Sequence, residues 1–211
     1  MFNKILFESF EDFFKSPHQN SFELNEGKGI VMVSAPHSVE QTRLGKIKFA
    51  EPQSGALSKI LHLNTGCPII CKTSNCKDDA NYDKISPYKD LIVDYVSKNK
   101  VKLVLDLHQL SEHRSIDINI GTGKMKNVKN ASYLRMVSEA FSNNGFGVFI
   151  DTPYEASYPF TVSSYVSSKC DVTCLQIEIN SKLLKSSFKT CRVQEIYNIL
   201  EKIIVECNFL T

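Results

Sequence analysis

Short apolar runs recur along the chain and predict the strands of a sheet. Residues 29–34 (GIVMVS) are mostly apolar, and they stop before Pro36, which disfavours the helical region for the residue preceding it. Residues 101–108 (VKLVLDLH) form a nearly continuous apolar run, which is typical of a central strand covered on both faces. Further strands are expected at residues 68–72, 115–120, 146–150 and 172–179.

Between these runs the apolar residues recur at helical spacing. A helix is predicted over residues 53–63, and Gly66 follows it as a helix-ending glycine. Another helix is predicted to begin at Pro87, since proline is favoured at the first helical position, and to extend to about residue 98. Helices are also expected at residues 130–144 and 193–207.

The alternation of strands and helices indicates an α/β fold. We expect a single domain over residues 1–211, with a mixed, mostly parallel central sheet and helices on both faces. Residues 1–28 begin with the phenylalanine-rich segment MFNKILFESFEDFFK, and we predict that they dock on the core. Residues 151–168 are rich in Ser, Thr, Tyr and Pro, and we predict that they form a flap loop.

Composition and charge exclude several classes of protein. The hydrophobic fraction of 42% and the charged fraction of 23% are ordinary for a globular domain. No apolar stretch reaches the roughly 18 residues of a membrane-spanning helix, and the net charge of +2 gives no argument for nucleic acid. The chain begins without a signal-peptide pattern, and its seven cysteines lack C-x-x-C spacing. We therefore expect a soluble cytoplasmic protein with reduced thiols.

Candidate chemistry lies where the predicted strands end, because ligands in α/β sheets bind at the carboxyl ends of strands. His37 and Glu40 follow the strand over residues 29–34. Residues three apart in a tight turn share a face, so this pair can bind one cation. A histidine that caps a turn beside a solvated glutamate is the alternative interpretation.

His108 ends the strand over residues 101–108, and Asp106 lies two residues earlier on the same face. An imidazole that binds a metal usually donates its other N–H to a carboxylate, and Asp106 can accept it. A histidine satisfied within the core is the alternative.

Glu178 lies inside the apolar strand over residues 172–179. A carboxylate is costly to bury unless it is paired or functional. Desolvation raises the pKa of such a group towards neutrality, which suits a general base. A structural ion pair is the alternative.

In combination these residues match a catalytic zinc site. Two histidines and one carboxylate, here His37, His108 and Glu40, are a ligand set that leaves one position open for water. Glu178 is the additional carboxylate that such a water needs as a base. The chain has no H-E-x-x-H motif, so a thermolysin-like helix site is excluded.

The same residues resemble the zinc carboxypeptidase superfamily and, within it, the N-formylglutamate amidohydrolase family. The resemblance extends over about residues 33–184. Its motifs are His37-x-x-Glu40, Asp106-Leu107-His108, residues 114–121 (RSIDINIG), Thr152-Pro153-Tyr154 and residues 175–180 (LQIEIN). It implies a zinc carboxypeptidase-like fold and a zinc-dependent hydrolase that cleaves an amide or peptide-type bond next to a carboxylate. It also implies that Gln176 supports Glu178 from the same strand.

The positions that hold substrate depart from the family pattern. Many members carry an Asn-Arg pair where this chain has Asn81-Tyr82, and an arginine where it has Ser181. We expect Arg114 and Arg43 to bind the substrate carboxylate instead, because a guanidinium binds carboxylates through two hydrogen bonds. A surface position is the alternative for each arginine.

Two more residues are expected to line the substrate site. Asn81 corresponds to the family's Asn-Arg loop, and Tyr154 lies in the predicted flap. For Tyr154, packing of a loop tyrosine is the alternative to substrate contact.

Three functions fit these observations. The first is a zinc amidohydrolase acting on a small N-formylglutamate-like or other N-acyl amino acid. The second is a zinc peptidase acting on cell-wall or poly-glutamate peptides. The third is a metal-containing binding module that has lost turnover. The expected partner is a small molecule or short peptide with a carboxylate, and neither nucleic acid nor a membrane; the sequence leaves the oligomeric state open.

Overall fold

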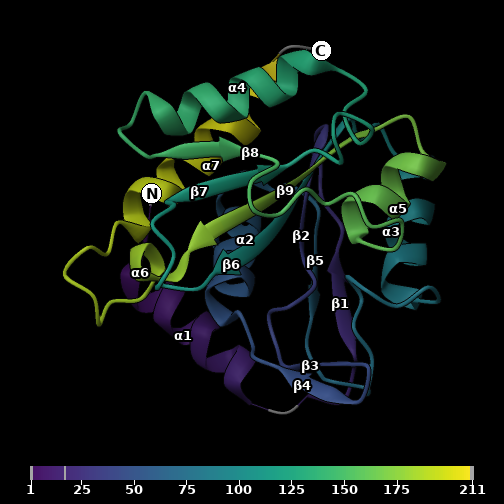
Figure 1. Ribbon diagram of the computed structural model, residues 1–211, viewed down its shortest axis with the longest axis horizontal. Coiled ribbons are helices and arrows are strands. Elements are labelled where there is room, and N and C mark those ends of the chain that lie inside the picture. The colour runs from purple at the N-terminus through teal and green to yellow at the C-terminus, as the bar shows by residue number, and fades with distance from the viewer. Residues whose placement is uncertain (1, 17, 210–211) are drawn as a thin grey trace.

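A seven-stranded sheet forms the centre of the fold in the computed structural model, which describes residues 2–16 and 18–209 (Figure 1). The strand order is β1-β5-β2-β6-β9-β7-β8. The strands are β1 (Phe22–Asn25), β2 (Val31–Ala35), β5 (Ile69–Lys72), β6 (Leu103–Leu110), β7 (Ile118–Gly121), β8 (Val148–Ile150) and β9 (Thr173–Asn180). Only β1 with β5 and β7 with β9 pair antiparallel, which confirms a mixed, mostly parallel sheet.

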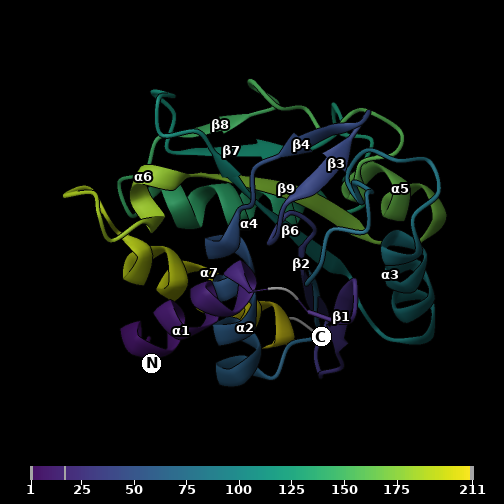
Figure 2. The same cartoon turned by 90° about the horizontal axis from the view of Figure 1, so that it is seen from below.

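Helices cover both faces of this sheet, as predicted. Figure 2 shows α3 and α5 on the opposite side of the sheet from α1, α2 and α7. The helices are α1 (Lys4–Lys15), α2 (Pro52–Thr65), α3 (Pro87–Lys98), α4 (Ala131–Ser142), α5 (Val162–Lys169), α6 (Ser181–Leu184) and α7 (Val193–Phe209). A separate two-stranded hairpin consists of β3 (Gln41–Arg43) and β4 (Lys46–Lys48). Within the described residues, no helix is both long and apolar enough to cross a membrane.

The parallel strands β2, β6 and β9 form the centre of the sheet, and their register positions the candidate residues. Asp106 of β6 lies between Ser34 of β2 and Gln176 of β9. Two residues further along, His108 of β6 lies beside Glu178 of β9. All eight residues of β9 are buried, so the carboxylate of Glu178 lies within the covered part of the sheet.

The predicted flap is only partly a loop. Residues 151–161 are irregular, but α5 begins at Val162 and includes the rest of the segment. Thr161 caps this helix, since its Oγ1 accepts a hydrogen bond of 3.2 Å from the Ser164 amide. Val162 and Val166 are buried in the core on the α3 side. Tertiary packing therefore stabilises a helix whose serine-rich sequence has weak helical propensity.

The N-terminal segment docks on the core through α1. Phe7 and Phe14 are buried in the larger apolar cluster. Gly55 of α2 permits this contact, because a Cβ at that position would lie 2.5 Å from a ring carbon of Phe14. The hairpin β3–β4 and the edge strand β1, in contrast, were not predicted from the sequence.

The packing of α1 is testable with one large-to-small substitution. We expect Phe14→Ala to lower the free energy of unfolding by about 3–5 kcal/mol, because it leaves a cavity between α1 and α2. Ile5→Ala on the exposed side of the same helix, where the side chain is 81% exposed, should change it by no more than about 0.5 kcal/mol. Urea unfolding measures both, and equal effects would contradict the packing.

Candidate metal and catalytic site

A cavity of about 480 Å³ lies at the carboxyl ends of β2, β6 and β9. Residues of the β3–β4 hairpin, of loop 79–83 and of loop 151–161 also contribute to its walls. The residues that line it include His37, Arg43, Lys48, Glu51, Asn81, Tyr82, His108, Tyr154, Tyr158, Gln176 and Glu178.

Three buried or half-buried side chains meet on its floor. His37 follows β2, His108 lies in β6, and Glu51 immediately precedes α2. One Glu51 oxygen lies 3.1 Å from His37 Nδ1, and the other lies 3.4 Å from His108 Nδ1. The two imidazole rings are nearly perpendicular, with centroids 4.8 Å apart. The nitrogen and oxygen atoms through which His37, Glu51 and His108 could bind a metal all lie within 4.8 Å of one another, as in a metal site.

The local backbone explains why Glu51 points into this cluster. Its amide donates a hydrogen bond of 2.8 Å to the carbonyl of His37. Glu51 occupies the N-cap position of α2, but its side chain makes no capping hydrogen bond. The carboxylate instead accepts a hydrogen bond of 2.9 Å from the amide of Gln109, which directs it across the end of β6.

A second carboxylate binds the far nitrogen of each imidazole. Asp79 lies 3.0 Å from His37 Nε2, and Asp106 lies 3.3 Å from His108 Nε2. Both aspartates are buried, and both have further partners: Arg43 donates to Asp79 at 2.7 Å, and the hydroxyl of Ser34 donates to Asp106 at 2.8 Å. With both Nε2 atoms held by carboxylates, Nδ1 is the atom that each imidazole presents to Glu51.

This donor set suits a divalent transition metal. In a tetrahedral zinc site with bonds of about 2.0–2.2 Å, neighbouring ligand atoms lie about 3.3 Å apart. The distances of 3.1 Å from one Glu51 oxygen to His37 Nδ1, and of 3.4 Å from the other oxygen to His108 Nδ1, are close to that spacing. Carboxylates on the outer side of both imidazoles are the usual surroundings of metal-bound histidine. His37, Glu51 and His108 can therefore hold a metal ion together.

The electrostatics of the cluster favour a cation between these groups. Burial opposes ionisation of Glu51, but the charges and hydrogen bonds of His37 and His108 outweigh it and lower the pKa of Glu51 to about 2. Burial likewise opposes protonation of His108, but Asp106 and Glu51 outweigh it and hold the pKa of His108 above its usual value. For His37, the charge of Glu51 and the hydrogen bond to Asp79 outweigh burial and raise its pKa. The excess of carboxylates in this buried space thus attracts positive charge.

Glu178 has a different environment from Glu51. Burial is the largest influence on it and, despite the nearby histidines, raises the pKa of Glu178 to about 7. Gln176 donates a hydrogen bond of 2.8 Å to one of its oxygens. The orientation of Gln176 is set by Asn81, whose own oxygen accepts a hydrogen bond of 2.7 Å from the amide of Val162. A carboxylate that exchanges a proton near neutrality is thus held at the cavity by a chain of side-chain amides.

The structure corrects one residue of the predicted ligand set. Glu40 is exposed, and it lines a different hollow together with Lys15 and Pro52. Residues 36–37 form a turn and residues 38–39 a bend rather than a helical turn, so the shared face of a helical turn does not apply. The carboxylate that reaches both histidines is Glu51.

The predicted substrate residues have different positions. Arg114 is exposed beyond the end of β6 and is absent from the cavity lining. The side-chain amide of Asn180 donates a hydrogen bond to the carbonyl of Arg114, which holds this turn against the end of β9 and away from the cavity. Arg43 and Tyr154 do line the cavity. Asn81 lines it as well, but both ends of its amide are engaged by protein groups, so it orients the site.

Several residues of the site were not predicted from the sequence, among them Glu51, Asp79 and Lys48. Glu51 precedes a proline at the start of a helix, where a carboxylate is already explained by the helix dipole. Asp79 is one of several acidic residues in a polar loop, and nothing in the spacing singles it out. Lys48 lies in the β3–β4 hairpin, whose three-residue strands are too short to show alternation.

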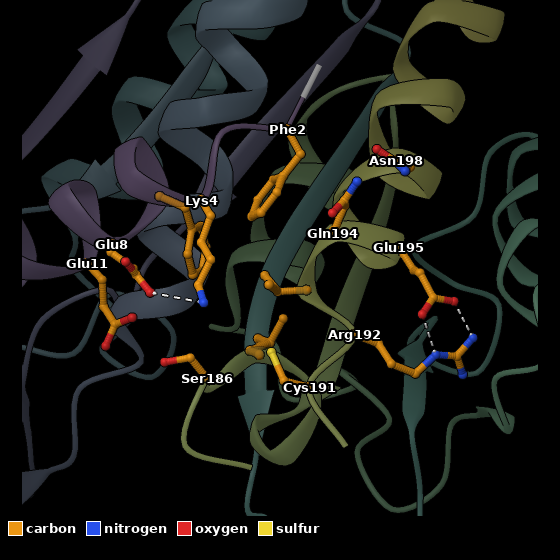
Figure 3. A pocket seen from close by; sticks show the side chains of 13 residues that line it. Phe2, Lys4, Glu8, Glu11, Ser186, Cys191, Arg192, Gln194, Glu195 and Asn198 are labelled. Carbon is orange, nitrogen blue, oxygen red and sulfur yellow. Dashed lines mark hydrogen bonds and ion pairs between the residues drawn. The ribbon is translucent and has the colours of Figure 1, made fainter. Parts of the chain in front are cut away.

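A second cavity, of about 430 Å³, lies between α1 and the start of α7 (Figure 3). Its charged residues largely neutralise one another, since Lys4 lies 3.8 Å from Glu8 and Arg192 lies 2.6 Å from Glu195. No histidine lines it. The cavity with the His37 cluster is therefore the candidate site.

Comparisons with known proteins agree with this fold. No protein-family model matches the chain, and no curated protein matches it significantly. Among solved structures, a bacteriophage poly-gamma-glutamate hydrolase has a TM-score of 0.60 at 11% identity and covers 97% of both chains. N-formylglutamate amidohydrolase from Ralstonia eutropha JMP134 has a TM-score of 0.59 at 12% identity, over 90% of this chain and 99% of that one.

A third similar structure, assigned as a carboxypeptidase A of Shewanella denitrificans OS-217, has a TM-score of 0.54 at 14% identity. The match covers 90% of this chain and 60% of that one. The chain thus has the α/β fold shared by N-formylglutamate amidohydrolase and carboxypeptidase-like proteins, which confirms the predicted fold class.

The ligand assignment is testable with two glutamates. We expect Glu51→Gln to weaken the binding of a divalent transition metal by at least about 100-fold, because the loss of an outer partner alone costs up to that much. Glu40→Gln should bind as the wild type does, since Glu40 lies outside the cluster. Competition with a chromogenic chelator measures both dissociation constants. The reverse order of effects would restore Glu40 as the ligand.

Proposed function

We propose that this protein is a zinc-dependent amidohydrolase that cleaves an amide or peptide-type bond in a substrate with a carboxylate. The observation that supports this most strongly is the presence of two kinds of carboxylate, one half-buried and one buried, in one cavity. Glu51 is ionised between two histidines, whereas Glu178 has a pKa raised to about 7. Metallohydrolases need one group of each kind, a ligand and a base.

Zinc is the proposed ion because two imidazoles and one carboxylate, with a further position left for water, are the donor set of catalytic zinc sites. A zinc ion bound by His37, Glu51 and His108 would polarise the substrate carbonyl and lower the pKa of a water molecule. Asp79 and Asp106 fix the two imidazoles for this purpose.

Glu178 is the proposed general base and acid. Its carboxylate takes a proton from the attacking water and then delivers it to the nitrogen of the leaving group. Gln176 holds one oxygen of Glu178 by a hydrogen bond, so the carboxylate keeps one orientation in both steps. A pKa near neutrality suits a group that must accept and then donate the same proton.

Lys48 and Arg43 are the proposed anchors for the substrate carboxylate. Both line the cavity, and the cross-strand pairs of the hairpin place them on the same face. Arg43 donates through Nε to Asp79, so part of its guanidinium is already engaged. Lys48 makes no ion pair with any residue that the structure describes, which leaves its ammonium available to an anion.

Peptides with several carboxylates are a second candidate substrate. An adjoining hollow shares Lys48, Glu51 and Gln109 with the cavity and continues towards Lys185 and Phe49. A substrate longer than one amino acid can therefore extend from the metal cluster along the surface. The similar bacteriophage structure is a poly-gamma-glutamate hydrolase, which is consistent with this alternative.

The seven free cysteines favour a reducing compartment, so the cytoplasm remains the proposed location.

Glu178→Gln tests the proposed base. We expect kcat to fall by about 10²–10⁴-fold on any N-acyl amino acid or glutamyl peptide that the wild type hydrolyses, because the proton acceptor is lost. Zinc content, measured by plasma mass spectrometry, should stay at the wild-type value, since Glu178 is not a ligand. Full activity in this variant would refute the mechanism. A wild type that binds such ligands tightly and releases them unchanged would indicate a binding module instead.

The pH dependence of hydrolysis should follow Glu178. Its carboxyl must be ionised to accept a proton, and burial raises its pKa to about 7. We therefore expect kcat to rise with pH until the carboxyl is ionised and then to level off. The pH profile of Glu178→Asp, which keeps the carboxylate, should retain this acidic limb. A wild-type rate that does not change with pH on the acidic side would contradict the assignment.

Lys48→Gln tests the carboxylate anchor. We expect KM to rise by about 10-fold for a substrate with a free carboxylate, because a hydrogen bond to a charged group is lost. The KM for the matching carboxamide substrate should not change. Lys100→Gln is the matched control, since Lys100 is exposed and precedes the amino end of β6, whereas the cavity lies at the carboxyl ends of the strands. Equal effects on the KM of both substrates would show that Lys48 does not bind the substrate carboxylate.

A further inference from the structure

Two tyrosines from separate loops form a stacked pair at the cavity. Tyr82 belongs to loop 79–83, and Tyr158 belongs to loop 151–161. Their ring centroids lie 5.1 Å apart with an angle of 20° between the ring planes. Both side chains line the cavity, and that of Tyr158 is 42% exposed. The pair thus joins a partly exposed loop to the loop that contains Asp79.

Contacts continue from this pair to a histidine of the metal cluster. The guanidinium carbon of Arg43 lies 4.8 Å from the ring centroid of Tyr82. Arg43 Nε donates a hydrogen bond of 2.7 Å to Oδ2 of Asp79. The other oxygen of Asp79 lies 3.0 Å from His37 Nε2. Each member touches the next, from a half-exposed tyrosine to a buried imidazole.

We propose that Tyr158 is a positioning residue for His37 and that it acts through Tyr82, Arg43 and Asp79. This inference rests on the proposed metal site, because its consequence is a higher affinity of that site for the metal ion. A ring stacked on Tyr82 restricts the rotamers of that side chain, which in turn supplies the aromatic surface for Arg43. A substrate that touches Tyr158 then influences the metal ligand without touching it.

The hydrogen bonds of Asp79 show why the orientation of this carboxylate depends on Arg43. Oδ1 accepts from the amide of Asn81 as well as facing His37, so it has two partners. Oδ2 accepts only from Arg43 among the described residues. Asp79 is fully buried, and a buried carboxylate oxygen without a partner is costly. If Arg43 shifts, Asp79 must turn, and its hydrogen bond to His37 changes with it.

Zinc affinity of the full-length protein, measured by chelator competition, tests the inference. We expect Tyr158→Ala to weaken zinc binding by about 2- to 10-fold, which is the range for the loss of one aromatic pair. Tyr158→Phe keeps the ring and should restore the wild-type affinity. Tyr154→Ala is the matched control, because Tyr154 lines the same cavity and is also 42% exposed. Among the described residues, Tyr154 makes no ring contact, cation–π contact or hydrogen bond with Tyr82, Arg43 or Asp79. Its zinc affinity should equal that of the wild type.

A double-mutant cycle distinguishes this route from general loosening of the loop. In a Tyr82→Ala background, Tyr158→Ala should have no further effect on zinc affinity, because the connecting ring is already absent. Unchanged zinc affinity in Tyr158→Ala, or the same loss with and without Tyr82, would overturn the inference and leave the amidohydrolase proposal intact. A wild type that binds no zinc would refute the proposed function directly, and the inference with it.

Discussion

Glu51 bridges two buried imidazoles, and the rest of the site is arranged around that contact. One carboxylate oxygen faces each Nδ1, at 3.1 and 3.4 Å. A carboxylate shielded from water stays ionised only if positive charge lies beside it. Protons on His37 and His108 can supply that charge, and a metal ion bound between these residues would supply it in their place. The aspartates behind the imidazoles add negative charge, so the cluster as a whole favours a bound cation.

The parallel sheet determines where the proposed base, Glu178, lies relative to this cluster. Strands β6 and β9 are paired over their full length, so His108 and Glu178 are neighbours by register. Glu178 differs from Glu51 in its hydrogen-bond partner, which is the neutral amide of Gln176. Burial is its largest influence, and its pKa rises to about 7 while that of Glu51 falls to about 2. Two carboxylates with opposite shifts suit the proposed roles of base and ligand.

Part of this arrangement could be predicted from the sequence. The apolar runs at residues 101–108 and 172–179 indicated the central strands, and polar residues within them indicated His108 and Glu178. Glu51 could not be found in this way, because its contacts depend on the β3–β4 hairpin and on the start of α2. The H-x-x-E spacing suggested Glu40 instead, which assumes a helical turn that the chain does not form. Strand patterns are local, whereas this ligand depends on how a loop returns to the sheet.

In the proposed site, His37, His108 and Glu51 would hold one zinc ion through both Nδ1 atoms and the Glu51 carboxylate. Anomalous diffraction at the zinc edge from crystals of the zinc-saturated protein tests it most directly. We expect one anomalous peak within bonding distance of His37 Nδ1, His108 Nδ1 and a Glu51 oxygen, with Asp79 and Asp106 still beside the Nε2 atoms. No peak in this cavity, or a peak bonded through Nε2 or to Glu40, would contradict it.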